Sequence, residues 1–575
     1  MRRRTPFALL LLATLALGRD ASAANWVWEK PVRVGSSEDG SLAFQELLRG
    51  RTPEFELHAL VNRRLSWFSV RSDHVTVGRN LDWAKAWAAR EELTYDPHGP
   101  LVALDLHAVV DASDRIHVVH EAFDSFGVHA TNVGYKTSAA PSQWMSTALP
   151  SFVNPVGDPS CTSGNPGICL SADAAGTEWI HVLYHRRPVA IDPPDPAACH
   201  SFWYVYNAKP LSVADPGAGW VGESWFTDLF QDQTYSLAGE GGVGLLPVMD
   251  GLGRIHAIGR KKVTRSDSVW VYHVYGFPPA AGETWKPTVV ALDSMPMLPA
   301  HLPAETPIVV TTQAVLGRSE RGECLDVVWN HNTREEGAMR TEVEFARFDV
   351  GADVWSRPVQ ISPEDSVSSQ AARLQRSPDG ALHVMYHEPS PQDPASRVYY
   401  RRAVGDPRDP ASWSTPQPVT YDVSGCANVP VFVAEGDTVW MGYTRHDPGF
   451  RRPFEAWFRK GWAIERHAAA HTTWSGLVWL DADYVVAEGD TLTILPGTLV
   501  VVAASSTADA AGFSPGKVDL VVEGSLEALG TPADSVRFET LAGSGRGSGW
   551  GGIRFTRTSC HDRIECARVT LADPR

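Results

Sequence analysis

A short apolar strand pattern recurs six times in this chain, and its spacing constrains the fold more than any other feature. The first copy reads Ile116-His117-Val118-Val119-His120-Glu121, and the others begin at Ile180, Ile255, Leu325, Leu382 and Val439. Equivalent positions are 64, 75, 70, 57 and 57 residues apart, which suits one four-stranded propeller blade with its loops. The fold class is therefore predicted to be all-β with a six-bladed β-propeller. A seven-bladed ring follows if residues 55–80 add a blade, with Leu65 to Val70 as a poorer copy of the strand.

Each repeat is predicted to begin with a hairpin and to end with an edge strand. Tight polar turns, such as Pro378-Asp379-Gly380, precede most copies and join antiparallel strands. Later in the repeat, Trp285, Trp355 and Trp413 each stand shortly before a proline and a short strand-like run. Proline is tolerated on an outer strand because one row of its backbone donors faces solvent.

The two ends of the propeller are predicted to meet. The last repeat ends near Trp462 without an outer strand, whereas a matching Trp-x-x-Pro stretch, Trp28 to Val34, stands alone near the N-terminus. Residues 26–34 should therefore complete the last blade and remove an exposed sheet edge. Leu81 to Leu93 is the one stretch predicted to form a surface helix.

Beyond a joint at residues 466–473, short strands separated by glycine turns recur at 489–494, 496–500, 518–526, 536–538 and 550–555. This pattern closely resembles the opening coils of right-handed parallel β-helix proteins, in which each coil must stack on another. The expected division is 1–23 signal peptide, 24–465 propeller, 466–473 linker and 474–575 β-helix coils. We expect the last domain to be incomplete, with an open end that can associate with another surface.

The propeller repeat resembles the sialidase-like family, whose repeats carry a related Asp-box motif. The Asp-Gly turn before an apolar His-Val strand, and the tryptophan of Asp409-Pro410-Ala411-Ser412-Trp413, carry the likeness over residues 26–465. The resemblance implies the fold. The family's Arg-Ile-Pro signature is absent, and its arginine triad, acid/base Asp and Tyr/Glu pair have no motif-matched positions here, so the resemblance does not extend to the catalytic residues of sialidases.

The N-terminus reads as a signal peptide. Three arginines precede an apolar run from Pro6 to Leu17 and the small residues Ala21-Ser22-Ala23, so cleavage is expected after Ala23. No apolar run approaches the roughly 20 residues of a membrane span, so we expect a protein without a transmembrane segment that is secreted, extracellular or periplasmic. The leader carries four Arg and one Asp, so its loss moves the formal charge from −16 to −19, which disfavours nucleic acid.

Seven cysteines would enter an oxidising compartment, where disulfides persist. Cys161 with Cys169, and Cys560 with Cys566, bracket short loops and are the predicted disulfides. Cys199, Cys324 and Cys426 remain, and no CxxC pair suggests zinc or redox chemistry.

Candidate ligand-binding residues come from the sixth position of the repeated strand, because the end of this strand reaches a propeller face that usually carries the site. They are Glu121, His185, Arg260, Asn330 and His387, with Thr444 in the last copy. Glu121 and Arg260 could supply acid/base and charge chemistry; alternatively, the set is a solvated polar rim. The second position holds His117, His181, His256 and His383, which we expect to make core or inter-blade hydrogen bonds rather than to meet at one metal.

No cofactor and no metal is predicted, although a structural calcium near Asp481, Asp483 and Asp490 is the alternative to solvated turn carboxylates. Two functions are compatible with the sequence. The first is a binding or scaffolding protein whose propeller face recognises an extracellular glycan or protein, without catalysis. The second is a sialidase-like glycoside hydrolase or polysaccharide lyase, which would need a convergent carboxylate pair or an arginine cluster over the central channel.

Overall fold

The computed structural model describes residues 25–570 with internal gaps. The gaps are residues 36–38, 52–54, 67–68, 94–101, 124–131, 141–142, 149–160, 174, 189–202, 216–217, 222–223, 227–245, 263–267, 279–284, 297–311, 336–337, 364–366, 390–395, 448–453, 465–469, 504–516, 542–548 and 557–560. The predicted signal peptide lies outside the described residues.

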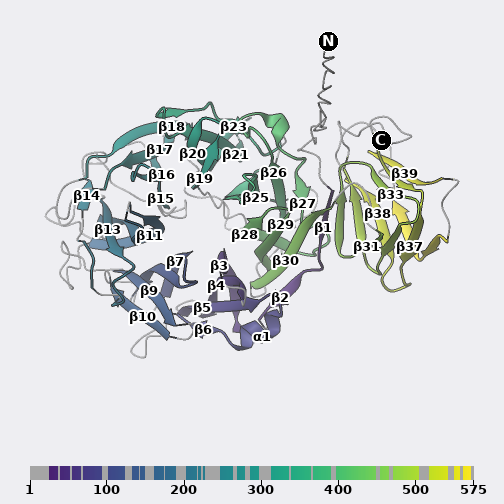
Figure 1. Cartoon of the computed structure of the whole chain (residues 1–575), viewed down its shortest axis with the longest axis horizontal. Helices are drawn as coiled ribbons and strands as arrows, with labels where there is room; N and C mark the ends of the chain where they lie inside the picture. Colours follow the sequence, from purple (N-terminus) through teal and green to yellow (C-terminus); the bar gives the residue numbers. More distant parts are fainter. Residues whose placement is uncertain are drawn as a thin grey trace, which may run out of the picture.

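Antiparallel sheets follow one another around a ring, as a propeller requires (Figure 1). Six blades are built from consecutive strands, and a seventh is completed by the N-terminal strand. Blade 1 contains β3 (Ser41–Arg49), β4 (Phe55–Ser66), β5 (Ser69–Gly78) and β6 (Glu91–Glu92); blade 2 contains β7 (Val102–Val110), β8 (Ile116–Phe123), β9 (Asn132–Ala140) and β10 (Gln143–Ala148); blade 3 contains β11 (Cys161–Ala172), β12 (Glu178–Pro188), β13 (Trp203–Pro210) and β14 (Ser224–Phe226). Blade 4 contains β15 (Pro247–Met249), β16 (Ile255–Lys262), β17 (Ser268–Gly276) and β18 (Thr288–Pro296); blade 5 contains β19 (Thr312–Ser319), β20 (Gly322–Glu335), β21 (Ala338–Asp349), β22 (Val354–Trp355) and β23 (Val359–Gln360). Blade 6 contains β24 (Gln370–Arg376), β25 (Leu382–Pro389), β26 (Ser396–Ala403) and β27 (Gln417–Pro418), and blade 7 contains β28 (Cys426–Glu435), β29 (Thr438–His446) and β30 (Glu455–Ile464) with β1 (Asn25–Trp28) and β2 (Val32–Val34).

The innermost strands close the ring. Each of β3, β7, β11, β15, β19, β24 and β28 contacts the innermost strand of the next blade, and β28 contacts β3. The six repeated strands are the second strands of blades 2 to 7, as the hairpin pattern predicts. Blade 1 supplies the additional unit, but its matching strand is Leu57–Asn62 within β4. The expected copy at Leu65 to Val70 was wrong, because these residues span the end of β4 and the start of β5, which pair through Ser66 and Ser69.

The predicted closure by the N-terminus is confirmed. β1 pairs antiparallel with β30, with Trp28 opposite Gly461, and β2 pairs with the same strand. A Cβ at Gly461 would lie 2.3 Å from the Trp28 ring, so only glycine leaves room for this indole. Trp26 and Trp28 are both fully buried and stack with their centroids 5.7 Å apart.

The single α-helix in the part of the chain described here is α1 (Trp83–Ala88), with the side chain of Asp82 accepting a hydrogen bond from the Lys85 amide at 3.0 Å. It is shorter than the expected Leu81 to Leu93, and it is not a freely exposed surface helix. Trp83 and Trp87 are buried because they pack with the core of blade 1.

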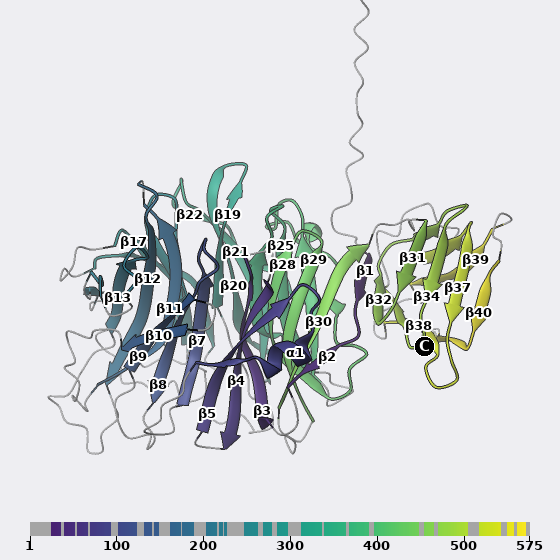
Figure 2. The same ribbon diagram turned by 60° about the horizontal axis from the view of Figure 1, so that its bottom comes forward.

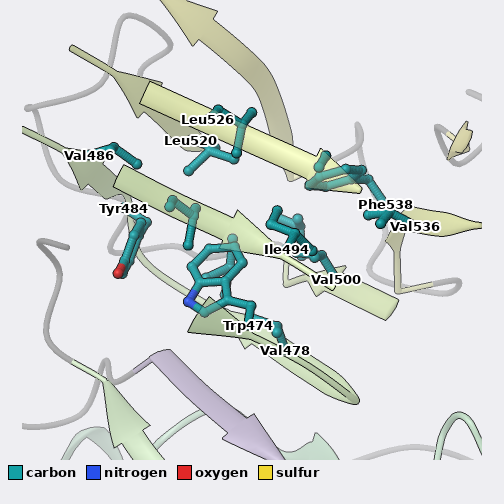
Figure 3. Close-up of a cluster of buried hydrophobic side chains, with 14 of the residues drawn as sticks. Trp474, Val478, Tyr484, Val486, Ile494, Val500, Leu520, Leu526, Val536 and Phe538 are labelled. Carbon is teal, nitrogen blue, oxygen red and sulfur yellow. The ribbon is translucent and has the colours of Figure 1, made fainter. Parts of the chain in front are cut away.

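Residues 471–570, here called the coil region, form three parallel sheets beside the ring (Figure 2). Their strands are β31 (His471–Trp474), β32 (Leu477–Leu480), β33 (Tyr484–Val486), β34 (Thr491–Ile494), β35 (Leu499–Val502), β36 (Val518–Val522), β37 (Ser525–Leu529), β38 (Val536–Thr540), β39 (Trp550–Phe555), β40 (Arg563–Glu565) and β41 (Ala567–Thr570). Each strand pairs with the one three places later, as in β31, β34, β37 and β40, so each turn of the chain stacks on the previous one. Figure 3 shows the enclosed side chains, including Trp474, Val500, Leu520 and Phe538.

One strand joins the two regions. The free edge of β1 pairs antiparallel with β32, so a single sheet runs from blade 7 through β1 into the coil region. Neighbouring side chains of a strand point to opposite faces. Accordingly, Val27 belongs to the core of the coil region, whereas Trp26 and Trp28 belong to a second cluster shared by blades 6 and 7 and the outer face of β32 and β35.

The predicted disulfides are wrong for the described cysteines. Cys169 and Cys566 are free thiols, and Cys560 lies outside the described residues. Cys161 and Cys169 both lie on β11, more than about 20 Å apart at the usual rise of a strand, whereas a disulfide needs Cα atoms within about 7 Å. The Gly/Pro stretch between them is a bulged strand rather than a loop.

Candidate functional site

The histidines at the second position of the repeat form hydrogen bonds inside their own blades, as expected. His117 contacts the Tyr135 hydroxyl at 2.8 Å and Asp111 at 3.0 Å, and His383 contacts the Tyr400 hydroxyl at 2.8 Å and the Ser377 hydroxyl at 2.9 Å. His181 and His256 make the corresponding pairs of contacts, with Tyr206 and Ser171, and with His273 and Asp250. All four are buried. The spacing that looked like a metal constellation is therefore a structural feature repeated around the ring.

The sixth-position residues do not form an open ring where their side chains are described. Asn330 is fully buried, and its amide donates to the Ser369 carbonyl of the next blade at 2.9 Å. His387 is buried, and its Nδ1 accepts from the Val429 amide of blade 7 at 3.4 Å. Thr444 is also buried. The backbones of Glu121, His185 and Arg260 lie in β8, β12 and β16, but their side chains lie outside the described set.

Three ionisable side chains meet between blades 4 and 5, near the sixth-position end of the repeated strands. His331 of β20 contacts Asp293 of β18 through Nδ1 and Oδ2 at 2.5 Å, and the Trp329 indole donates to the same oxygen at 2.9 Å. Glu344 of β21 lies directly opposite Trp329 in the sheet, so both side chains point toward blade 4. The backbone row Arg260, Val271 and Asp293 leads across blade 4 to this cluster.

The environments of the two carboxyl groups push their pKa values apart. Burial raises the pKa of Glu344 to about 7, with His331 opposing this shift and the charge of Asp293 adding to it. Burial alone would raise the pKa of Asp293, but hydrogen bonds from His331, Trp329 and the Ser294 amide hold it below the usual value. One carboxyl group is then ionised near neutral pH while the other still holds a proton part of the time, which is the arrangement that acid–base catalysis needs.

His331 and Asp293 are partly open to solvent, with side chains 24% and 16% exposed. The Nδ1 contact with an ionised Asp293 places the imidazole proton on Nδ1 and the lone pair on Nε2. We call Asp293, His331 and Glu344 the acid–base cluster.

Another histidine–carboxylate contact joins the innermost strands of blades 1 and 2. His107 of β7 lies 2.8 Å from Glu46 of β3, and both side chains are partly exposed. Each residue stands next to a break in the pairing register of its strand, where a bulge re-aims side chains. The His107–Glu46 pair contains one carboxyl group, whereas the acid–base cluster contains two carboxyl groups with different pKa values.

No group of three or more His, Cys, Asp or Glu in the described ranges is arranged to hold a metal ion. Asp481 and Asp483 are buried rather than solvated, and Asp483 accepts from the Asp519 amide at 2.8 Å. Asp490 is half-buried and directly follows the turn at Glu488 and Gly489. The three carboxylates therefore differ in environment, and the expectation that all are solvated turn residues was wrong for the first two.

The sequence analysis missed the acid–base cluster, although two of its three members lie close to the predicted sixth-position residues. His331 directly follows the predicted Asn330, and Asp293 is in the row of Arg260. Glu344 lies on a third strand that carries no repeated motif. The feature that could have indicated the cluster in the sequence is a charged residue at a strand position whose side chain faces the neighbouring blade, where most other side chains are apolar.

Comparisons with known proteins give likenesses in fold. No family model and no curated protein matches the sequence. Similar solved structures include a protein of unknown function from Dyadobacter fermentans, at 13% identity over 63% of this chain and 95% of that chain, with a TM-score of 0.37. They also include the GH93 α-L-arabinofuranosidase of Fusarium graminearum, at 10% identity, 62% and 92% coverage and a TM-score of 0.37, and the polysaccharide lyase Uly1, at 10% identity, 77% and 100% coverage and a TM-score of 0.36.

Two of these three structures are of carbohydrate-active enzymes. At TM-scores below 0.5 the likenesses carry no argument about the activity of this chain. Among the described residues, the structure has no helix that is long and apolar enough to cross a membrane.

Proposed function

We propose that this protein is a carbohydrate-cleaving enzyme, a glycoside hydrolase or polysaccharide lyase. The observation that supports it is the acid–base cluster, in which Asp293, His331 and Glu344 come together from two blades. Under this proposal Asp293 orients His331 and stabilises its charged form, while Glu344 exchanges a proton with substrate. In hydrolysis Glu344 protonates the leaving glycosidic oxygen; in elimination Nε2 of His331 removes the proton beside a uronate carboxyl group.

The proposal includes export after cleavage at Ala23 and a glycan held on the same propeller face by Glu121, His185 and Arg260. In it, the coil region is a right-handed parallel β-helix that spaces the propeller from other surfaces, and its last strands are a place for association. Determination of the N-terminal residue of the exported protein tests the first of these points, and Met1 there would contradict it.

The deciding experiment measures turnover by the full chain on a panel of neutral and acidic polysaccharides, following reducing ends and the ultraviolet absorbance of unsaturated uronates. We expect Glu344→Gln to lower kcat by roughly 100-fold or more, the usual contribution of a positioned acid or base. Glu91→Gln is the matched control, because Glu91 also contacts a histidine, His74 at 3.4 Å, but on the outer strands of blade 1.

The pH profile separates a chemical role from a structural one. Glu344 acting as an acid requires its protonated form, so kcat should fall as pH rises through about 7, and Glu344→Gln should abolish this limb. Glycan affinity without turnover on any substrate would instead support the binding and scaffolding hypothesis. Turnover that is unchanged in Glu344→Gln, Asp293→Asn and His331→Ala would contradict the assignment of the site.

A further inference from the structure

A cavity of about 720 Å³ lies between blades 5 and 6, at the hairpin-turn end of their strands. It is lined by the β19–β20 turn, the β21–β22 turn, the β24–β25 turn and the segment after β26. Cys324 in its wall and His331 of the acid–base cluster are seven residues apart on β20, or about 23 Å at the rise of a strand. The cavity is therefore separate from the acid–base cluster.

Its lining is rich in arginine. Five guanidinium groups contribute, from Arg318, Arg321, Arg347, Arg376 and Arg408. Only three carboxylates do so, from Glu320, Asp349 and Asp406. Arg408 and Asp406 neutralise each other at 2.6 Å, and Asp349 accepts the Gly351 and Ala352 amides. Burial raises the pKa of the Cys324 thiol to about 11, so this wall adds no negative charge at neutral pH.

Two of the arginines are held in place from behind. Arg347 of blade 5 donates to Asp326 through Nε at 2.7 Å and Nη2 at 3.1 Å, and Arg376 of blade 6 donates to the same carboxylate. Asp326 is fully buried, and one carboxylate is shared by two guanidinium groups. Arg376 also donates to the Gly380 carbonyl at 2.7 Å.

This arrangement replaces the histidine found at the same position in other blades. Asp326 stands at the second position of the repeated strand, where blades 2, 3, 4 and 6 have His117, His181, His256 and His383, each in contact with a tyrosine hydroxyl or a histidine ring on the third strand. In blade 5 the residue opposite is Arg347. Residue 317 must be glycine for Arg376 to adopt this position, because a Cβ at residue 317 would lie only 2.0 Å from Arg376 Nε. Glycine at 317 thus leaves the space that the Arg376 side chain occupies.

The remaining wall suits a sugar ring. Val354 is 58% exposed, and the partly buried Trp355 lines the cavity beside it. Arg318 and Arg321 are exposed on the β19–β20 hairpin at the mouth. Arginine side chains at fixed positions pair with planar and tetrahedral oxyanions, and an aromatic wall packs against the apolar face of a pyranose.

We propose that this cavity is a second saccharide-binding site, selective for sugars that carry an oxyanion, a uronate carboxylate or a sulfate ester. It binds the anion between Arg347, Arg376 and the two hairpin arginines, with the ring against Val354 and Trp355. The site is independent of the acid–base cluster and holds whether or not that cluster cleaves glycans.

Isothermal titration calorimetry on the full-length Glu344→Gln protein tests this, with a galacturonate trisaccharide, its methyl ester and a sulfated disaccharide as probes. The acid should bind and its neutral ester should bind at least tenfold more weakly; comparison of the uronate with the sulfated sugar identifies the preferred anion. A higher salt concentration should weaken the binding of the acidic trisaccharide, because salt screens its attraction to the arginines. Equal affinity for acid and ester, or binding of neither the uronate nor the sulfated sugar, would overturn the proposal.

Variants locate the binding. Arg318→Ala with Arg321→Ala removes exposed side chains and should raise Kd at least tenfold, and Gly317→Ala should do the same by displacing Arg376. Arg79→Ala is the control, an exposed arginine after β5 in blade 1. Thermal unfolding of each variant shows whether it is folded. An unchanged Kd in the folded double variant would contradict the assignment of the binding site. The turnover measured for Glu344→Gln does not affect this assignment, because that experiment tests a residue of the acid–base cluster and not of the cavity.

Discussion

The propeller and the coil region are both built from strands, but they fill their interiors differently. Adjacent blades pack through apolar side chains together with buried, hydrogen-bonded histidines such as His117 and His383. The coil region encloses mainly Val, Leu, Ile and aromatic residues, and its two described histidines, His471 and His561, are exposed. The difference in histidine burial predicts that the ring should respond more strongly to acid than the stack of coils.

The two regions nevertheless share a strand and a core. β1 pairs with both, and a cluster of buried side chains extends from Met385 and Tyr400 of blade 6 to Trp479 and Val501 of the coil region. We therefore expect some changes to affect one region and others to affect both.

The largest expected effect comes from Trp26→Ala combined with Trp28→Ala. Each indole is fully buried, and each truncation should cost about 3–5 kcal/mol, against a total stability of about 5–15 kcal/mol for a typical domain. Because both rings pack in the shared cluster, hydrogen exchange should show faster opening of blade 7 and of β32 and β35. Trp270→Ala, at a side chain 43% exposed, is the control. Faster exchange in only one region would show that the regions are not energetically coupled through β1.

Acidification should separate the regions. Burial lowers the pKa of His58 and His181 to about 4 and, together with neighbouring charges, that of His383 to about 3. The unfolded chain binds these protons near pH 6.5, so the stability from neutral histidines is present above 6.5 and is lost as pH falls toward 4. Each histidine contributes on the order of 3–5 kcal/mol. Burial raises the pKa values of Glu344, Glu29 and Asp73, and these carboxyl groups act in the opposite direction.

Hydrogen exchange at pH 7 and pH 4.5, corrected for intrinsic rates, checks this expectation. Blades should lose protection on acidification while β34 to β38 retain it. His383→Gln keeps a polar side chain at the position and should reduce the pH dependence of blade 6. Equal losses in ring and coils would mean that the buried histidines do not control acid stability.

A smaller effect should come from the sheet between the two regions. Val500 packs in the coil core and Val501 in the shared cluster, so the strand is buried on both faces. Val500→Thr and Val501→Thr should each destabilise the protein by about 1–3 kcal/mol, because a hydroxyl enters an apolar site. Val485→Thr, at a half-buried position of β33, should cost less. A neutral Val501→Thr would indicate that the outer face of this sheet is wetted.

The smallest expected effect is that of reducing agent. Since Cys169 and Cys566 are free, dithiothreitol should leave the unfolding temperature unchanged. In the native protein a thiol reagent should modify exposed Cys566 but not Cys169, Cys324 or Cys426, which are buried. A fall in unfolding temperature on reduction would show that a disulfide forms elsewhere in the chain.

Much of the ring was predictable because it depends on local patterns. The repeated strand, the hairpin turns and the tryptophan before each outer strand are encoded within each repeat, and the unpaired Trp28 to Val34 stretch indicated how the ring closes. The stacking of coils followed from glycine turns between short apolar strands. The copy in blade 1 was misplaced because the polar stretch before Leu57–Asn62, Gly50 to Glu54, lacks the aspartate found in turns such as Pro378-Asp379-Gly380.

The sequence by itself therefore determined that this protein is a closed ring of similar sheets followed by stacked coils, since burial of alternating apolar residues requires partners on both faces. Only the tertiary structure decided which charged groups meet. Asp293 reaches His331 across 38 residues, and Asp326 of blade 5 reaches Arg376 of blade 6 across 50. Such contacts depend on how far each blade is rotated against the next and on which way its side chains point. Neither quantity is set by the period of the repeat, so the acid–base cluster and the arginine-lined cavity emerge only when the ring is assembled.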